Sequence, residues 1–156
     1  MKPVIVASTD VEEAQKIIEI IPKDHKVAII ETSNRLKILL NVSVMVILDH
    51  SFYEQYGLEF FRSLLKNPHP PFLILTPIDD IQIIVDIMEI GMRFIPKVQD
   101  YQKLLRLTAN SILDQIDEQE QQQERVSNLT QRVEELEKAA SEERESQNRE
   151  ASPETK

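Results

Sequence analysis

The stretch VSVMVILD, residues 42–49, decides the fold. An unbroken apolar run from Val44 to Leu48 leads directly into Asp49. A strand that is apolar on both faces is typical of a parallel sheet covered by helices on both sides. The run therefore predicts a central strand. It leaves open whether the carboxylate at its end is a solvated loop residue or lies at a cleft and takes part in chemistry there.

Other segments of the same character precede and follow this stretch, and helical patterns separate them. The predicted strands are PVIVAS (3–8), KVAIIET (26–32), VSVMVILD (42–49), PFLILT (71–76) and RFIPK (93–97). Apolar residues recur at helical spacing over 10–21, 33–41, 56–67, 79–91 and 100–116. Asp10, with Glu13 in a capping-box pattern, and Ser33 are predicted N-terminal caps, and Gly91 is a predicted C-terminal glycine. This alternation predicts an α/β fold, a flavodoxin-like, doubly wound, five-stranded parallel sheet in the order 2-1-3-4-5.

Composition excludes several classes of function. The chain has 156 residues, no cysteine and a formal net charge of −9. Disulfides, a thiol nucleophile and cysteine-ligated metal sites are therefore excluded. An acidic chain without a basic stripe argues against nucleic acid as a partner. No apolar run reaches the ~18 residues of a membrane helix or resembles a signal peptide, so we expect no membrane contact and a cytoplasmic location.

The chain changes character near residue 117. Residues 1–116 predict one domain, 117–143 predict a helix that continues from 100–116, and 144–156 are predicted to be disordered. Within the helix, apolar residues at spacings of 3, 4, 3 and 4 predict a short coiled-coil seam with β-branched residues at position a, which favours a parallel homodimer. The alternative is a solvated or disordered tail. The seam residues are Val126, Leu129, Val133, Leu136 and Ala140.

In open α/β sheets, functional sites lie beyond the carboxyl ends of the strands. Those ends carry Ser8, Thr9, Asp10, Asp49, Thr76 and Lys97. With only Gly57 and Gly91 as glycines, the chain cannot build a glycine-rich phosphate loop there.

This set of residues resembles that of a response-regulator receiver domain over residues 1 to about 116. Asp49 falls on the family's phospho-acceptor position, and Gly57, Leu58 and Glu59 follow at the family's spacing. Thr76 falls on the family's Ser/Thr position, Phe94 on its switch aromatic and Lys97 on its lysine. The resemblance implies a module of two-component phosphorelay signal transduction that is not itself an enzyme. It also implies Thr76, Phe94 and Lys97 as phosphoryl-contact or switch positions, and Mg²⁺ as the cofactor.

The sequence departs from the family where the metal is bound. Ser8 and Thr9 stand where receivers place two acids, and Asp10 fits better as a helix cap. Hydroxyls bind Mg²⁺ less well than carboxylates, which leaves Asp49 as a candidate ligand and Asp10 as a weaker one. We therefore expect a degenerate pseudo-receiver that needs no cofactor, binds Mg²⁺ weakly at most and acts through contacts with a signalling or scaffold protein. An Asp49–Lys97 ion pair would then be a structural clasp.

Two alternatives remain open. In the first, the chain is a conventional single-domain response regulator that a histidine kinase phosphorylates on Asp49. In the second, it is a flavodoxin-like enzyme or small-ligand binder. The degenerate and the conventional readings differ in one respect. The space between Ser8, Asp49 and Lys97 is either closed by Lys97 or takes a metal ion.

Overall fold

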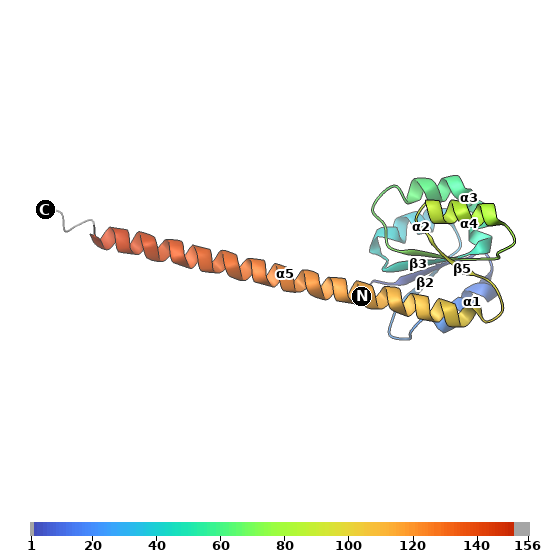
Figure 1. The fold of residues 1–156 in the computed structure, drawn as a ribbon, viewed down its shortest axis with the longest axis horizontal. Coiled ribbons are helices and arrows are strands. Elements are labelled where there is room, and N and C mark those ends of the chain that lie inside the picture. The colour runs from blue at the N-terminus through green and yellow to red at the C-terminus, as the bar shows by residue number, and fades with distance from the viewer. Residues whose placement is uncertain (1, 152–156) are drawn as a thin grey trace. The chain divides into compact units, whose positions relative to one another are not determined.

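The computed structural model describes residues 2–151, with side chains described as far as residue 144. The chain divides into two units near residue 114. The first unit is a five-stranded parallel sheet with helices on both faces (Figure 1). The strand order β2-β1-β3-β4-β5 confirms the predicted fold class. The strands are β1 (Val4–Ala7), β2 (Val27–Ile30), β3 (Met45–Asp49), β4 (Phe72–Thr76) and β5 (Arg93–Pro96).

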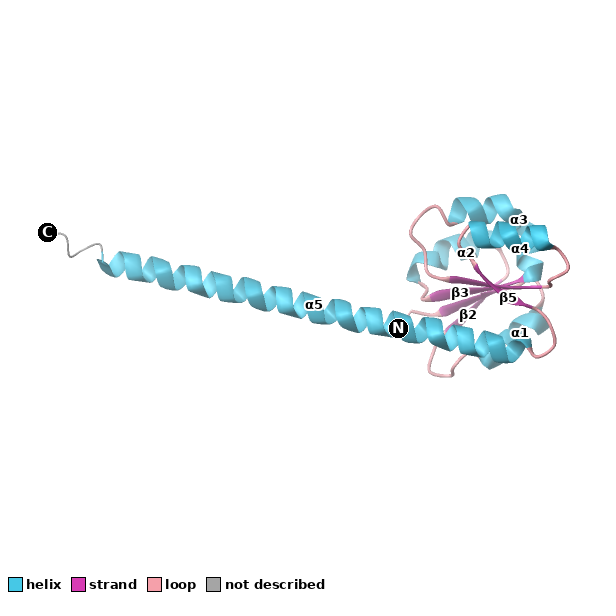
Figure 2. Ribbon diagram, viewed as in Figure 1, coloured by secondary structure: helices cyan, strands magenta, loops and turns pink. Residues whose placement is uncertain are grey.

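The helices cover both faces of this sheet (Figure 2). They are α1 (Val11–Ile20), α2 (Ser33–Leu39) with the short 3₁₀ helix η1 (Leu40–Val42), α3 (His50–Leu64), α4 (Ile81–Glu89) and α5 (Tyr101–Ala151). Helices α2, α3 and α4 lie on one face, and α1 and the first turns of α5 lie on the other (Figure 1). Among the described residues, no helix has a stretch long and apolar enough to cross a membrane.

The core forms because alternate residues of each strand face opposite layers. Val46 and Ile74 pack with Phe61 of α3 and Ile87 of α4 in one buried cluster. On the other face, Ala14 and Ile17 of α1 and Leu105, Ala109 and Ile112 of α5 are buried. All the residues of β3 are buried, as the apolar run at 44–48 predicts. The central strand therefore delivers Asp49 to the edge of the sheet from inside the core.

The starts of α1 and α2 differ in detail from the prediction. Asp10 caps α1, since its carboxylate accepts hydrogen bonds from the backbone N–H groups of Glu12 and Glu13. The Glu13 side chain does not complete a capping box, because it pairs with lysine side chains instead. Thr32, not Ser33, caps α2 by accepting a hydrogen bond from the Arg35 N–H. The prediction of Ser33 as the cap was wrong by one residue.

Helix α3 begins at His50, directly after β3, and not at residue 56 as predicted. Gly57, with φ 82° and ψ 171°, divides it into two halves, of which the prediction found only the second. The first half is rich in aromatic residues of modest helix propensity, but Phe52 and Tyr53 are buried, so tertiary packing decides its conformation. The early start places His50 and Ser51 beside Asp49.

Helix α5 is continuous from Tyr101 to Ala151, which agrees with the predicted single long helix. The helix extends beyond the predicted limit at residue 143, into the segment predicted to be disordered. Residues 152–156 of that segment lie outside the described residues.

Candidate functional site

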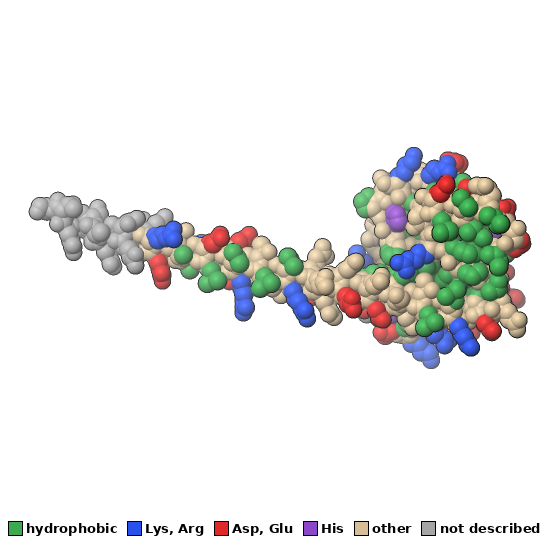
Figure 3. All heavy atoms as spheres, viewed as in Figure 1, with side chains coloured by type: hydrophobic (Ala, Val, Ile, Leu, Met, Phe, Trp, Pro, Cys, Tyr) green, Lys and Arg blue, Asp and Glu red, His purple; other side chains and the backbone are tan. Residues whose placement is uncertain are grey.

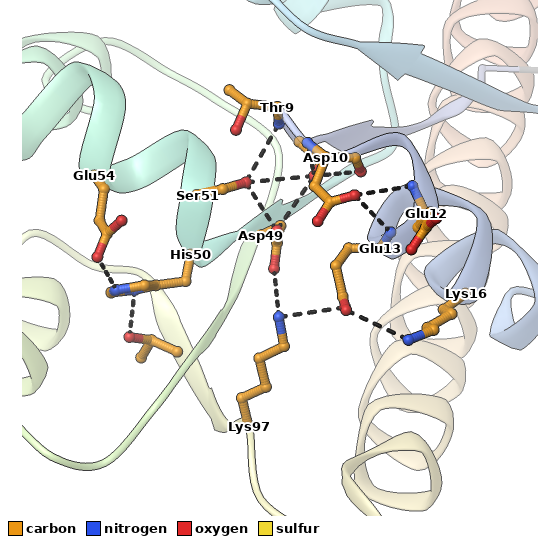
Figure 4. A network of polar contacts seen from close by, with 12 residues as sticks. Thr9, Asp10, Glu12, Glu13, Lys16, Asp49, His50, Ser51, Glu54 and Lys97 are labelled. Atoms are coloured by element: carbon orange, nitrogen blue, oxygen red, sulfur yellow. Dashed lines mark hydrogen bonds and ion pairs between the residues drawn. The ribbon is translucent and has the colours of Figure 1, made fainter.

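The carboxyl ends of the strands bring several predicted site residues to one edge of the sheet (Figure 4). The parallel register pairs Ala7 of β1 with Leu48 of β3, so that Ser8 and Asp49, the residues that follow, are neighbours. Lys97 follows β5, and its backbone N–H donates to the carbonyl of Thr76 at 2.9 Å. The structure thus gathers Ser8, Asp49 and Lys97 into one cluster.

Asp49 is a buried carboxylate, with 2% of its surface exposed. Its Oδ2 accepts a hydrogen bond from Ser51 Oγ at 2.8 Å and lies 3.2 Å from Ser8 Oγ. Its Oδ1 lies 3.2 Å from Lys97 Nζ. A charged group remains stable in a buried position only when it is paired and hydrogen-bonded, and these contacts meet that requirement. Asp49 is therefore not a solvated loop residue.

Two serine hydroxyls connect this carboxylate to the loop after β1. The oxygen of Ser51 accepts a hydrogen bond from the Thr9 backbone N–H at 3.3 Å. The oxygen of Ser8 accepts one from the Asp10 N–H at 3.0 Å, and the same hydroxyl lies 3.0 Å from the Asp10 carbonyl. The Ser8 hydroxyl therefore has both the Asp49 carboxylate and the backbone of Asp10 as hydrogen-bond partners. Ser51 is the more direct donor to Asp49.

Lys97 bridges two carboxylates. Its Nζ lies 3.2 Å from Asp49 Oδ1 and 3.2 Å from Glu13 Oε2, while Glu13 Oε1 lies 3.5 Å from Lys16 Nζ. Figure 4 shows these side chains as a line of alternating charges that joins β3, β5 and α1. Burial alone lowers the pKa of Lys97, but the Asp49 and Glu13 carboxylates outweigh it, so the pKa lies above its ordinary value. The ammonium is thus held in its charged form.

The hydroxyl of Thr76 is bonded to His50 rather than to Asp49. Thr76 Oγ1 lies 2.7 Å from His50 Nδ1, and His50 Nε2 lies 2.8 Å from Glu54 Oε1. In the neutral imidazole of His50, the Nε2–H group donates to the Glu54 carboxylate, which can only accept, and Nδ1 accepts a hydrogen bond from the Thr76 hydroxyl. The Thr76 hydroxyl therefore uses its proton in the hydrogen bond to His50.

Among the hydrogen bonds of the described residues, none joins the side chain of Phe94, Thr9 or Asp10 to the Asp49 carboxylate. Phe94 is half-buried in β5, and Thr9 is exposed and offers its N–H to Ser51. Asp10 is exposed and uses its carboxylate as the α1 cap.

The side chains around Asp49 do not fit a Mg²⁺ ion. A hard divalent cation takes oxygen ligands, with carboxylates to balance its charge. Beside Asp49 stand two neutral hydroxyls and an ammonium group. Within the side chains described, residues 2–144, no three His, Cys, Asp or Glu groups lie together so that they could hold a metal ion.

Sequence reasoning did not identify Glu13, Ser51 or His50 as contributing to the contacts at this edge of the sheet. Ser51 and His50 would have followed from placing the start of α3 directly after Asp49, because first-turn side chains lie beside the residue that precedes a helix. Glu13 carried no such signal. Its local spacing to Asp10 indicates a capping box, whereas its partner Lys97 lies at the far end of the sheet order.

No family model and no curated protein matches the chain. Among solved structures, the chain is similar to the response regulator DrrB of Thermotoga maritima, with 19% identity and a TM-score of 0.61 over 74% of this chain and 54% of that chain. The beryllofluoride-activated DrrB receiver domain gives the same identity and TM-score over 73% of this chain and 98% of that chain. A two-component response regulator of Clostridium difficile gives 16% identity and a TM-score of 0.62 over 74% and 98%.

These likenesses show what kind of fold the first unit has. The chain spans about half the length of the full DrrB regulator and nearly all of the DrrB receiver domain. The first unit therefore has the receiver-domain fold.

Proposed function

We propose that the chain is a receiver-like signalling module that works without Mg²⁺-dependent phosphorylation of Asp49. The observation that carries the proposal is the set of groups that contact Asp49, which are the hydroxyls of Ser8 and Ser51 and the ammonium of Lys97. Where the resembled family places two metal-binding acids, this chain offers the hydroxyl of Ser8 and the backbone N–H of Thr9 to the cluster. The positive charge that faces Asp49 comes from the protein itself.

The chemistry of phosphoryl transfer supports this reading. A carboxylate that attacks phosphorus needs a free oxygen and a cation that offsets the phosphoryl charge. In this cluster Asp49 Oδ2 accepts from Ser51, Oδ1 contacts Lys97, and the Thr76 hydroxyl is bonded to His50. These contacts fit a clasp that fastens α1 and β5 to β3 better than a reactive site, so we assign the module no catalytic activity.

An exposed apolar surface supports action by protein contact. Ile81, Val85 and Met88 follow one side of α4, and Figure 3 shows hydrophobic side chains gathered over this part of the first unit. Leu104 and Leu107 of α5 are exposed as well. Contiguous apolar patches on a folded surface mark binding sites for proteins. We propose a signalling or scaffold protein as the partner of this surface, and a second copy of the chain as the partner of the C-terminal helix. A cytoplasmic location stays a prediction from the sequence.

The conventional alternative keeps some support. Asp49 ends β3 and contacts Lys97, which is where the resembled family keeps its phospho-acceptor and its lysine. In this alternative a histidine kinase phosphorylates Asp49 with a weakened metal site.

A titration with Mg²⁺ and beryllofluoride separates the two functions. We expect no saturable binding at millimolar Mg²⁺, for the wild type and for Asp49→Asn alike, measured by calorimetry. The DrrB receiver domain, which beryllofluoride activates, is the positive control. Restoring acids by Ser8→Asp with Thr9→Asp should bring Mg²⁺ binding back if their loss is the cause. Saturable binding by the wild type that Asp49→Asn abolishes would establish the conventional function, and tight binding of a flavin or nucleotide would favour the small-ligand reading.

A further inference from the structure

We propose that the exposed apolar stripe of the second unit is the seam of a parallel, in-register homodimer. The inference rests on the proposed function, in which the C-terminal helix contacts a second copy. Leu129 is 60% exposed and Leu136 is 70% exposed, with Val126 and Val133 at 61% and 52% on the same helix. Side chains of this kind at alternating spacings of 3 and 4 lie along one side of α5.

The sequence of α5 limits the length of this seam. With Val126 and Val133 at position a and Leu129 and Leu136 at position d, Ala140 is the next a residue. The preceding a and d positions are Gln119 and Gln122, and the following d position is Glu143. The apolar contact therefore runs from Val126 to Ala140 and ends at polar layers on both sides. Because the seam is so short, association should depend strongly on concentration.

The charges beside the seam select the orientation. In a parallel coiled coil, a g residue faces the e residue of the next heptad on the other helix. Arg132 is at g and Glu137 is at e, so two copies form this attractive pair twice. The antiparallel alignment that pairs the same apolar layers sets Val126 against Leu136, and it brings Arg132 opposite a second Arg132. The charges therefore favour the parallel orientation, and in a parallel coiled coil β-branched residues at a with leucine at d favour two strands.

The same features identify the occupant as a second copy of this chain. In the parallel arrangement each apolar layer meets an identical layer, and because every copy carries both residues, Arg132 of one copy meets Glu137 of the other. The stripe is thus complementary to itself, in its shape and in its charges.

Sedimentation equilibrium of the full chain over a series of concentrations tests the seam. We expect a monomer–dimer equilibrium that Leu129→Ala with Leu136→Ala weakens at least tenfold. Alanine is the best helix former, so helix content measured by circular dichroism should be kept. The matched control is Asn128→Ala with Glu135→Ala, which changes the neighbouring c positions and should leave association unchanged. A full chain that is monomeric throughout, or a seam variant that dimerises like the wild type, overturns the proposal.

Two further variants of the full chain test the orientation. Arg132→Glu should weaken association several-fold in the parallel dimer, and adding Glu137→Arg should restore it. In the antiparallel dimer, Arg132→Glu exchanges one like-charge pair for another and changes little. No change on Arg132→Glu, or no recovery in the double variant, rejects the parallel assignment.

Disulfide cross-linking gives an independent reading, because the chain has no cysteine of its own. Leu136→Cys places two thiols in one layer of a parallel dimer, whereas the antiparallel dimer separates them by about 15 Å along the axis. We expect fast oxidation to a covalent dimer for Leu136→Cys and slow oxidation for the control Glu135→Cys. Equal rates would overturn the proposal. A failed dimer leaves the Mg²⁺ titration unaffected, and Mg²⁺ binding would leave the dimer standing, so the two proposals fail separately.

Discussion

Asp49 keeps a charged carboxylate in a buried position because Ser8, Ser51 and Lys97 replace the water that burial removes. Removing one member of a buried ion pair costs more than the pair contributes, since the remaining charge is left without compensation. Lys97 also contacts Glu13, so its loss would expose two carboxylates to each other across the cluster. The stability of the first unit should therefore be sensitive to this one side chain.

Lys97→Met should lower the free energy of unfolding by about 2–4 kcal/mol at neutral pH, measured by urea denaturation. Adding Asp49→Asn should recover part of the loss, because the buried charge is then absent. The control is Lys16→Met, whose ammonium pairs with the same Glu13 but is 58% exposed, and which should cost less than about 1 kcal/mol. Equal losses for the two lysine variants would show that the clasp does not stabilise the fold.

The same ammonium predicts a loss of stability at alkaline pH. Because the pKa of Lys97 is raised above its ordinary value of 10.5, its stabilisation is complete below that value and disappears as the pH rises through the folded-state pKa. Burial raises the pKa of Tyr53 and of Tyr101, so their ionisation destabilises the fold in the same direction. Thermal unfolding across this range should show a steeper decline for the wild type than for Lys97→Met. Parallel curves would contradict the assignment.

His50 holds a buried hydroxyl, since Thr76 is only 1% exposed and bonds to the His50 ring. His50→Ala leaves that hydroxyl unpaired and should cost about 1–2 kcal/mol of unfolding free energy. Combining it with Thr76→Val should add little, because the hydroxyl is then gone. The exposed Glu54, replaced by glutamine, serves as the control for the outer end of this chain of contacts. Additive losses in the double variant would argue against the His50–Thr76 contact.

At the scale of elements, the strands were predictable because each central strand is buried on both faces and so carries an unbroken apolar run. The boundaries of the helices were less predictable than the strands. Thr32 and Ser33 can both cap a helix, and the extended backbone of Thr32, with φ −123° and ψ 151°, decides between them. The first half of α3 depends on the burial of Phe52 and Tyr53, which a local pattern does not contain.

The residues of the candidate site likewise fall into those that the sequence predicted and those that it did not. Asp49 and Lys97 were predicted as site residues because they end strands and match the spacing of the resembled family, and the structure places them in contact. Glu13 was assigned to a local cap, but a partner distant in sequence takes its side chain. The contact of Ser51 with Asp49 could be recognised only once the structure showed that α3 begins directly after Asp49. Non-local contacts therefore account for the part of the cluster that the sequence did not predict.

Gly57 separates the two halves of α3 with φ 82° and ψ 171°, a conformation that is essentially restricted to glycine. A Cβ built at this position has no atom within 4 Å, so steric contact adds nothing to the backbone strain. Gly57→Ala should therefore cost about 1–3 kcal/mol of unfolding free energy in urea. Ser63→Ala in the second half of the same helix should change it by less than about 0.5 kcal/mol. A neutral Gly57→Ala would mean that α3 can straighten without loss.

At the scale of the whole molecule, the two units differ in what stabilises them. The buried apolar side chains among the described residues all lie between Val4 and Leu113. The apolar side chains of the second unit, from Val126 to Leu136, are exposed along α5. Most helical stability in proteins comes from packing an apolar face. The first unit therefore carries its own core, whereas the apolar stripe of the second unit is exposed.

Ending the chain at residue 117 separates these contributions. Because the truncation removes no buried apolar residue, it should change the free energy of unfolding of the first unit by less than about 0.5 kcal/mol. It should also sediment as a monomer at concentrations at which the full chain dimerises. The full chain with Leu129→Ala and Leu136→Ala is the matched control and should behave like the truncation. If the truncated chain dimerised as the full chain does, the exposed apolar surface on α4 and α5 would be the self-association surface, and α5 beyond residue 117 would be free to bind a different partner.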